Sequence, residues 1–446
     1  MAAQRQLGLV SATALVVASM IGSGVFTTSG FLLADLQTPG RVLAAWLGGG
    51  VLAMLGALSY GALARRFPES GGEYIFLGRT LHPAAGTLAG WVSLLVGFSA
   101  PLAAVALAFG EYTKDWFASP PVTGTCLIIT FAAVHALHVQ RGAWLQNAAV
   151  LLKLVLIGVL LCRAGMSLRA VTPAASGSFP LAAFAVSLVW VSFSYSGWNA
   201  AVYVAGEVRE PGRNLPRSLL LGSGLVTVVY LALNAVFVYA APTDKLAGKL
   251  EVGRIAAEAL GGAALANFVT VLIGLALATA ASSMIMAGPR VYARMADDGC
   301  LPRWFRFPAQ GPPRQAILLQ TILALLMLWS ASFKALLTYI GFTLSLCTAG
   351  AVAGLIRQRR REGPALAVPG WPWVPALFVA GVLTMTTLTV AREPLASGVG
   401  LGTLGIGWLG WYLAVRRAPG SALTSLPPVS SNKPTTEKHQ TEEPKP

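Results

Sequence analysis

The chain has 446 residues, of which 55% are hydrophobic and only 11% are charged. This composition, with a mean hydropathy of +0.66, excludes an ordinary soluble domain and indicates a membrane protein with several spans. A net charge of +15 would suggest a nucleic-acid partner in a soluble protein. In a membrane protein, Lys and Arg report orientation first, so we expect contact with membrane lipid and no nucleic acid.

The apolar runs recur along almost the whole chain. A helix needs about 20 apolar residues to cross roughly 30 Å of hydrocarbon. Twelve runs of this kind lie at about 7–35, 41–64, 84–111, 121–138, 144–163, 180–206, 216–241, 263–289, 314–332, 335–356, 371–391 and 396–415. The sequence therefore predicts an all-α membrane protein with twelve transmembrane helices. The first run is too long for a signal peptide, so we expect it to remain in the mature protein.

The distribution of Lys and Arg predicts the orientation. With the N-terminus in the cytoplasm, the inner loops hold more of these residues than the outer loops, as cytoplasmic loops generally do. We therefore expect a multi-pass protein of the cell membrane with both termini in the cytoplasm. The tail 418–446 is rich in Pro, Ser, Thr, Lys and Glu, and we expect it to be disordered because it cannot bury enough apolar surface.

Two of the twelve spans are interrupted near their middles. The first contains Gly22-Ser23-Gly24 within "SMIGSGVFTTSG", and the sixth contains "FSYSGWNAA" at residues 193–201. Because the two spans are five helices apart, the second enters the membrane from the opposite side, as in an inverted-topology repeat. Close helix packing is the alternative explanation for Gly22 and Gly24. The matching interruption in the sixth span argues against it.

This repeat predicts the division of the chain. The first inverted repeat covers 1–163 and contains helices 1 to 5, and the second covers 164–362 and contains helices 6 to 10. Helices 11 and 12, within 363–417, are then an addition to the five-plus-five core.

The break in the first helix predicts an anion site. Non-helical backbone persists inside a membrane only where protein or a water-filled cavity satisfies its polar groups. The N–H groups of Ser23, Gly24 and Val25 begin the outer half of this helix, where the helix dipole favours a carboxylate. Glycine also lets a ligand approach the backbone closely.

The ends of the preceding half-helices predict a matching cation site. The carbonyls of Phe193, Ser194 and Ser196 end the inward-running half of the sixth helix, and the carbonyl of Ile21 ends the inner half of the first. The dipole at such C-terminal ends favours an ammonium group. A zwitterion therefore suits the two breaks together.

The sixth span also predicts side-chain selectivity. Ser194, Ser196 and Asn199 can hydrogen-bond a small polar side chain, while Trp190, Phe193 and Trp198 can line an apolar pocket; helix bonding is the alternative for Asn199. The segment contains no acidic residue, so a cationic side chain would be buried unpaired at a cost in free energy. Neutral substrates are favoured.

Five motifs carry a resemblance to a known family. They are "IGSGVF", "RRFPESGGEYIF" at 65–76, "SFSYSGWN", "GEVREPGRNLP" and "GPRVYARMADDGCLP" at 288–302. The chain resembles the amino acid–polyamine–organocation superfamily, especially its L-type amino acid transporter branch. This resemblance implies the five-plus-five fold of the bacterial leucine transporter, with helices 1 and 6 broken at the midplane and an amino acid held between them. It also implies that Phe193 is an aromatic gate, although packing is its alternative role.

Lys153 is a cation in the middle of the fifth run. It lies about ten residues from either end, so its ammonium is roughly 15 Å from each interface, too far for its side chain to reach water easily. Sodium-coupled relatives hold a cation between helices 1, 5 and 8, and L-type relatives carry a lysine at the matching position. The resemblance therefore implies that Lys153 replaces sodium, with Ser282 and Ser283 as candidate partners, and that transport is sodium-independent.

Charged residues at the inner ends of helices 6 and 8 suggest a gate. Glu207 and Arg290 lie there, and an ion pair between them would latch the cytoplasmic side. A static loop contact is the alternative.

The expected function is secondary active transport of neutral L-amino acids by alternating access, as sodium-independent exchange. A proton-coupled or cationic amino acid permease is the alternative. A membrane enzyme or a channel is disfavoured, because charge is nearly absent inside the spans. The four cysteines have no metal-ligand spacing, so we expect no metal or cofactor.

Animal L-type transporters are linked to a glycoprotein through a cysteine in the loop between helices 3 and 4. The corresponding loop here, "EYTKDWFASPPVTG", has none. We therefore expect no covalently linked ancillary subunit.

Overall fold

The computed structural model describes residues 7–117, 119–137, 151–152, 154–162, 179–297, 301–306, 308 and 312–417, apart from the side chains of 290, 294, 297 and 414–417. The tail 418–446, which we predict to be disordered, lies outside these residues.

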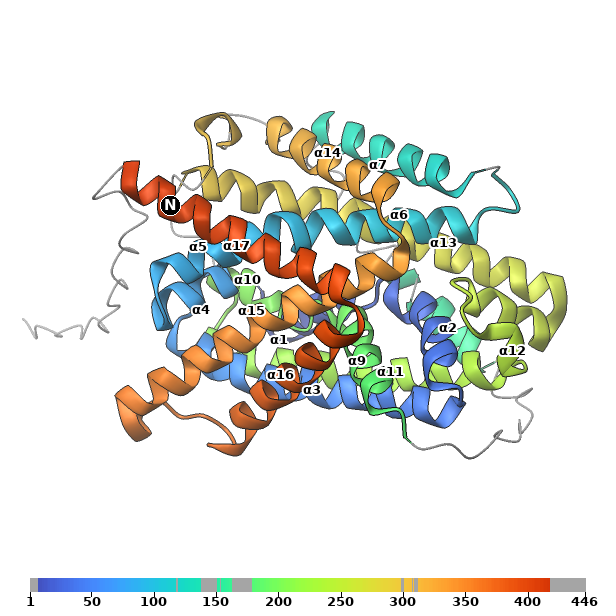
Figure 1. Ribbon diagram of the computed structural model, residues 1–446, viewed down its shortest axis with the longest axis horizontal. Helices are drawn as coiled ribbons and strands as arrows, with labels where there is room; N and C mark the ends of the chain where they lie inside the picture. Colours follow the sequence, from blue (N-terminus) through green and yellow to red (C-terminus); the bar gives the residue numbers. More distant parts are fainter. Residues whose placement is uncertain are drawn as a thin grey trace, which may run out of the picture.

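The described chain is helical throughout its length (Figure 1). Its first part contains α1 (Leu9–Met20), α2 (Gly24–Leu36), α3 (Pro39–Arg66), α4 (Glu73–Thr80), α5 (Pro83–Val92), the π-helix η1 (Ser93–Ser99), α6 (Ala100–Tyr112) and α7 (Pro120–Leu137). Its second part contains α9 (Leu181–Tyr195), α10 (Ala200–Tyr203), η2 (Ala205–Glu207), α11 (Pro211–Tyr239), α12 (Thr243–Leu246), α13 (Val252–Asp297), η3 (Arg303–Phe305), α14 (Arg314–Ser330), α15 (Phe333–Glu362), η4 (Gly363–Ala365), α16 (Trp373–Arg392) and α17 (Pro394–Arg417).

Local sequence explains where several helices begin. Proline is the first residue of α3, α5, α7, α11 and α17. It suits this position because an N–H group in the first turn has no partner within the helix, so nothing is lost when proline lacks one. The Thr38 hydroxyl caps α3 by accepting from the N–H of Arg41, and the Ser332 hydroxyl caps α15 by accepting from the N–H of Ala335. Inside α13, non-helical Gly261 and Gly262 separate a short first segment from the long apolar one.

The length and apolar composition of the helices agree with a multi-pass membrane protein. Among the described residues, seven helices are long and apolar enough to cross a membrane, or eight if α1 and α2 form one bent span. The helices α9 and α14 are apolar but shorter. The full set of twelve spans stays a prediction.

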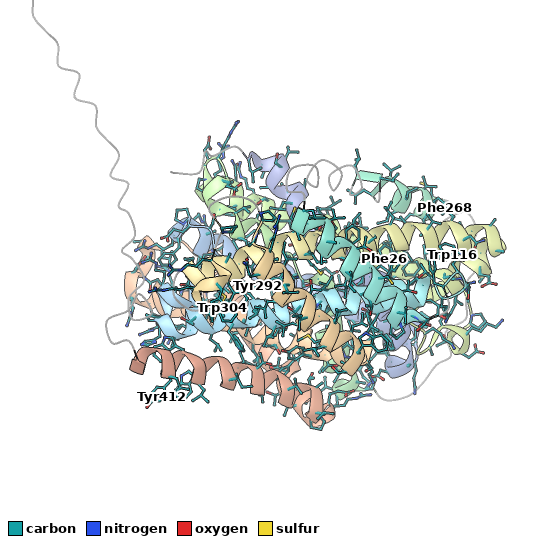
Figure 2. All side chains as sticks on the ribbon, turned by 90° about the horizontal axis from the view of Figure 1, so that it is seen from above. Phe26, Trp116, Phe268, Tyr292, Trp304 and Tyr412 are labelled. Atoms are coloured by element: carbon teal, nitrogen blue, oxygen red, sulfur yellow. The ribbon has the colours of Figure 1, made fainter. Side chains whose placement is uncertain are left out.

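The interrupted helices lie in the middle of the molecule. Figure 1 shows α6, α7, α13 and α14 along one side and α3, α11 and α16 along the other, with α1, α2, α9 and α10 between them. Figure 2 shows Trp304 and Tyr412 toward one end of the molecule and Trp116 and Phe268 toward the other. Aromatic side chains are common at both interfaces of a membrane protein.

Candidate functional site

The first interruption is confirmed at the predicted residues. Helix α1 ends at Met20, α2 begins at Gly24, and the two helices are bent by 44°. The break is buried, since Ile21 is 1% exposed and Ser23 is 2% exposed. Gly22 N–H donates to the Met20 carbonyl over 2.7 Å, which closes a tight turn at the end of α1.

The start of α2 leaves three amides without backbone partners. The N–H of Phe26 makes the first bond of this helix, to the Ser23 carbonyl at 3.1 Å. No backbone hydrogen bond in the described chain uses the N–H groups of Ser23, Gly24 or Val25. Such unpaired amides at a helix N-terminus attract negative charge.

The second interruption is also confirmed. Helix α9 ends at Tyr195, and α10 begins at Ala200. Ser196 is extended, with ψ 141°, and Gly197 has φ +100°. That conformation strains any residue with a Cβ, and a Cβ on Gly197 would also lie 2.7 Å from the Ser19 carbonyl oxygen. The break in the sixth span therefore rests on the last turn of α1.

The first break packs closely on α9. This packing corrects our prediction that close helix packing does not explain Gly24. A Cβ on Gly24 would lie 2.6 Å from the Cα of Ser194, so a close packing role is present there. At Gly22 the nearest such atom is 3.9 Å away, so packing does not require glycine. Neither residue has a positive φ. The Thr28 and Ser194 hydroxyls are 3.0 Å apart and add a polar contact beside this approach.

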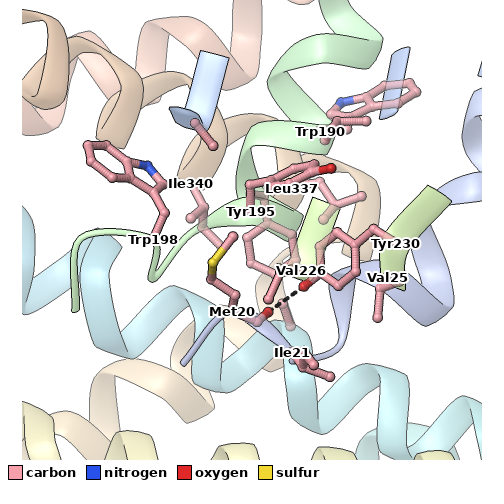
Figure 3. Packing of buried hydrophobic residues seen from close by; sticks show 14 of the residues in the cluster. Met20, Ile21, Val25, Trp190, Tyr195, Trp198, Val226, Tyr230, Leu337 and Ile340 are labelled. Atoms are coloured by element: carbon pink, nitrogen blue, oxygen red, sulfur yellow. Dashed lines mark hydrogen bonds between the residues drawn. The ribbon is translucent and has the colours of Figure 1, made fainter. Parts of the chain in front are cut away.

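Tyr230 of α11 joins the two breaks. Its hydroxyl oxygen is 2.5 Å from the Met20 carbonyl (Figure 3). The same oxygen is 2.9 Å from the Ser194 carbonyl. These carbonyls lie in the last turns of α1 and α9. Because one hydroxyl has a single proton to donate, the two carbonyls share it and keep lone pairs for a further donor. Sequence reasoning missed Tyr230.

The surroundings of Tyr230 hold its ring in place. Its ring centroid is 5.4 Å from that of Trp46 and 5.0 Å from that of Tyr195. Asn234, one turn later, donates to the Tyr230 carbonyl and accepts from the Ser29 hydroxyl. The only sequence signal for this role is the pair of polar residues Tyr230 and Asn234, four apart on one face of an apolar helix.

Two of the carbonyls predicted for the sixth helix already accept hydrogen bonds. The Phe193 carbonyl accepts from the Ser196 N–H at 3.0 Å, and the Ser194 carbonyl accepts from Tyr230. Each oxygen retains a second lone pair. The Phe193 side chain is 5% exposed, and its role as a gate stays a prediction.

The structure brings a carboxylate to the sixth span that its local sequence lacks. Asn199 donates through Nδ2 to Oε1 of Glu73, the first residue of α4. The two residues are 126 positions apart, so inspection of residues around the break missed this contact.

The residues predicted for coupling are only partly described. Lys153 and the side chain of Arg290 lie outside the described residues. Ser282 Oγ is 2.9 Å from Nε2 of His135, and the Ser283 hydroxyl donates to the Thr279 carbonyl. Contacts of Lys153 with these serines therefore stay predictions.

The predicted latch between Glu207 and Arg290 also stays a prediction. The Glu207 carbonyl accepts from the Leu7 N–H at 3.0 Å, and the Leu7 carbonyl accepts from the Arg209 N–H at 2.8 Å. This pairing fixes the chain before α1 beside the end of the sixth span. It does not involve the Glu207 carboxylate.

Other features of the described chain suggest no competing site. Within the described residues, no group of three or more His, Cys, Asp or Glu is arranged to hold a metal ion. A cavity of about 310 Å³ lies beside Glu111, Leu250 and Phe333, and its lining includes none of the break residues.

Comparison with known proteins agrees with the geometry. The model of a family described as amino acid permease matches residues 7–410. The chain is 34% identical over 259 residues to the b(0,+)-type amino acid transporter 1 of Oryctolagus cuniculus, a match that covers 54% of this chain and 53% of that protein. In this match the chain spans about half the length of the curated b(0,+)-type relative.

Two further relatives match along most of the chain. The large neutral amino acids transporter small subunit 2 of Rattus norvegicus is 28% identical over 93% of this chain and 81% of its own. The serine/threonine exchanger SteT of Bacillus subtilis (strain 168) is 25% identical over 94% of this chain and 98% of its own. The chain thus belongs to the amino acid permease family of the amino acid–polyamine–organocation superfamily and resembles its L-type transporter branch.

Proposed function

We propose that this protein is a secondary active transporter that exchanges neutral L-amino acids across the cell membrane without sodium. The observation that carries the proposal is the meeting of two interrupted helices at one hydroxyl, that of Tyr230. Family membership and the names of the relatives support it.

The backbone of the two breaks would bind the part that all amino acids share. The unpaired amides of Ser23, Gly24 and Val25 suit the substrate carboxylate. The carbonyls of Met20 and Ser194 suit its ammonium, because each can accept a further hydrogen bond beside Tyr230. Ile21, Phe193, Ser196 and Asn199 complete the binding set predicted from the sequence, which did not include Met20.

Selectivity would then come from the sixth span, with Phe193 as the gate and Ser194, Ser196 and Asn199 as polar contacts. Glu73 accepts a hydrogen bond from Asn199 and would be the counter-charge for a cationic substrate side chain if its oxygens were free. However, three protein donors already occupy its oxygens: Tyr60, Asn199 and Tyr203. This arrangement favours neutral substrates.

We propose the five-plus-five inverted repeat for the architecture, with 1–163 and 164–362 as the two repeats and both termini in the cytoplasm. The interruptions of the first and sixth spans support it. Lys153 would take the place of sodium between helices 1, 5 and 8, close to Ser282 and Ser283. Glu207 and Arg290 would form the inner latch.

We also propose that the chain works without a covalently linked subunit. The rat relative is named a small subunit. The loop between α6 and α7 in this chain contains no cysteine that would make such a link.

Uptake into proteoliposomes tests the proposal. Purified protein would be given a panel of labelled neutral, cationic and acidic amino acids, with or without unlabelled amino acid inside. We expect internal neutral amino acid to stimulate uptake of neutral substrates, and replacement of sodium by choline to change nothing. Uptake that requires sodium would contradict the proposal. Uptake driven by a proton gradient into empty vesicles would support the alternative permease.

A further inference from the structure

A buried carboxylate on α4 touches the inner half of the sixth span. Glu73 is 6% exposed, and it belongs to no ion pair in the described part of the chain. A buried charge is costly unless hydrogen bonds stabilise it. Glu73 has three, from the Tyr60 hydroxyl at 2.9 Å, the Tyr203 hydroxyl at 2.5 Å and the Asn199 side-chain amide.

The chemistry of these contacts fixes their direction. An ionised carboxylate only accepts hydrogen bonds, and bonds to it are stronger than those between neutral groups. Asn199 must therefore present its NH₂ group to Glu73. The Glu73 carboxylate connects α10, which follows the second break, to α3, because Tyr203 lies on α10 and Tyr60 lies on α3.

The turn before α4 is shaped to deliver Glu73 to this position. Gly71 and Gly72 have φ values of +138° and +54°. A Cβ on Gly72 would lie 2.8 Å from Cδ1 of Tyr203. The ring of Tyr60 packs at 4.7 Å from that of Trp198, within the break itself. The sequence "SGGEY" thus forms a tight turn that packs against Tyr203, in the inner half of the sixth span. We call the place where this turn and α4 meet α3 the corner.

We propose that Glu73 is a positioning residue that clamps the inner half of the sixth span, through Asn199 and Tyr203, to the corner formed by α3 and α4. This inference rests on the proposed transport function. It assigns Glu73 a task separate from the contacts of the breaks with the substrate.

The clamp matters most when the site faces the cytoplasm. In the structure, the inner half of the sixth span is also held by α1, through Gly197 on Ser19 and through the pairing of Leu7 with Glu207 and Arg209. We expect inward opening to separate α1 from the inner half of the sixth span, which would remove those contacts. The Glu73 contacts do not involve α1, so they persist and keep Asn199 in place.

The test compares substrate binding from the two faces. KM for a neutral amino acid would be measured in right-side-out and inside-out vesicles for the full chain and for Glu73→Gln, which keeps the size of the side chain but removes its charge. We expect the KM at the cytoplasmic face to rise about tenfold, as for the loss of one charge-assisted hydrogen bond, and the KM at the outer face to stay within about twofold.

Two further variants keep the test decisive. Tyr203→Phe removes a single donor and keeps the Glu73 carboxyl group, so we expect the same one-sided change at smaller size even where Glu73→Gln fails to fold. Glu69→Gln is the matched control, because Glu69 lies in the same turn region but pairs with Arg79 at 3.3 Å instead of bonding to Asn199 or Tyr203. We expect its KM to be unchanged at both faces.

The outcomes separate this inference from the proposed function. Equal changes of KM at both faces, or no change for both Glu73→Gln and Tyr203→Phe, would overturn the clamp. Failure of the unmodified protein to exchange neutral amino acids would instead overturn the proposed function.

Discussion

The two breaks are built differently, although both interrupt an apolar helix for a few residues. The first is held by close backbone packing at Gly24, and it leaves amides unpaired and open space beside Gly22. The second also packs closely on backbone, at Gly197 against Ser19, but side chains hold it as well: Trp198 packs on Tyr60, and Asn199 bonds to Glu73. The first break therefore offers backbone groups to a ligand. The position of the second break is set by contacts with neighbouring helices.

The strongest way to break this comparison is to add one methyl group at either glycine of the first break. Gly24→Ala places a Cβ against the Ser194 backbone, and we expect it to destabilise the fold by about 2 kcal/mol and to lower transport on the order of 100-fold. Gly22→Ala is the matched control for packing, because the atom nearest to a Cβ at position 22 is the Met20 carbonyl oxygen, 3.9 Å away. It should keep the melting temperature and raise only KM, since its methyl group enters the space proposed for the substrate. Equal melting temperatures for both variants would show that Gly24 is not a packing residue.

The next effect concerns the support of the first break by Lys153. We expect Lys153→Ala to lower exchange roughly 30-fold, the kinetic equivalent of losing about 2 kcal/mol from a charge-assisted contact, while the protein still reaches the membrane. Uptake assays together with surface labelling would measure the two quantities. Normal exchange by this variant would remove Lys153 from the mechanism, and an equal loss of labelling would indicate a folding defect.

A smaller effect is expected where the breaks meet. Tyr230→Phe removes the hydroxyl between Met20 and Ser194, and we expect KM to rise about tenfold because two carbonyls lose their shared donor. Tyr195→Phe is the matched control, since that buried hydroxyl donates to the Trp46 carbonyl of α3 at 3.1 Å and not to a carbonyl at the end of α1 or α9. Titrating substrate in exchange assays would measure both values. Similar KM values for the two variants would contradict a special role for Tyr230.

The smallest effect is expected in the loop after α6, outside both breaks. Lys114, in the loop after α6, bonds to Glu111 and Glu251. Partial burial lowers the pKa of Lys114, but the two carboxylates raise it more, so the pKa lies above its usual range. Since the side chain is 38% exposed, we expect Lys114→Met to cost less than about 1 kcal/mol at neutral pH.

The pH dependence of that variant follows from the sign of the shift. A raised pKa means that the folded protein holds the proton more tightly, so the stabilisation is complete below the usual lysine pKa. It is lost as the pH rises through the raised value. Thermal unfolding in detergent between neutral and alkaline pH should show the difference shrink at the alkaline end, with exchange unaffected at neutral pH. A large transport defect would extend the site to this loop.

The sequence by itself determined the helical membrane class, the location of both interruptions and the family. Hydrophobic runs and glycine-rich breaks act through the backbone of neighbouring residues, so their consequences are local and can be recognised locally. The motifs "IGSGVF" and "SFSYSGWN" carry this information within a few residues each.

Only the tertiary structure decided which atoms complete each break. Glycine at position 24 is required by Ser194, Tyr230 lies between carbonyls from two other helices, and Glu73 reaches Asn199 across 126 residues. None of these partners has a signal near the break in sequence. The physical reason is that a buried backbone or amide group must find a hydrogen-bond partner wherever the packed helices provide one, and that choice is made by packing in three dimensions.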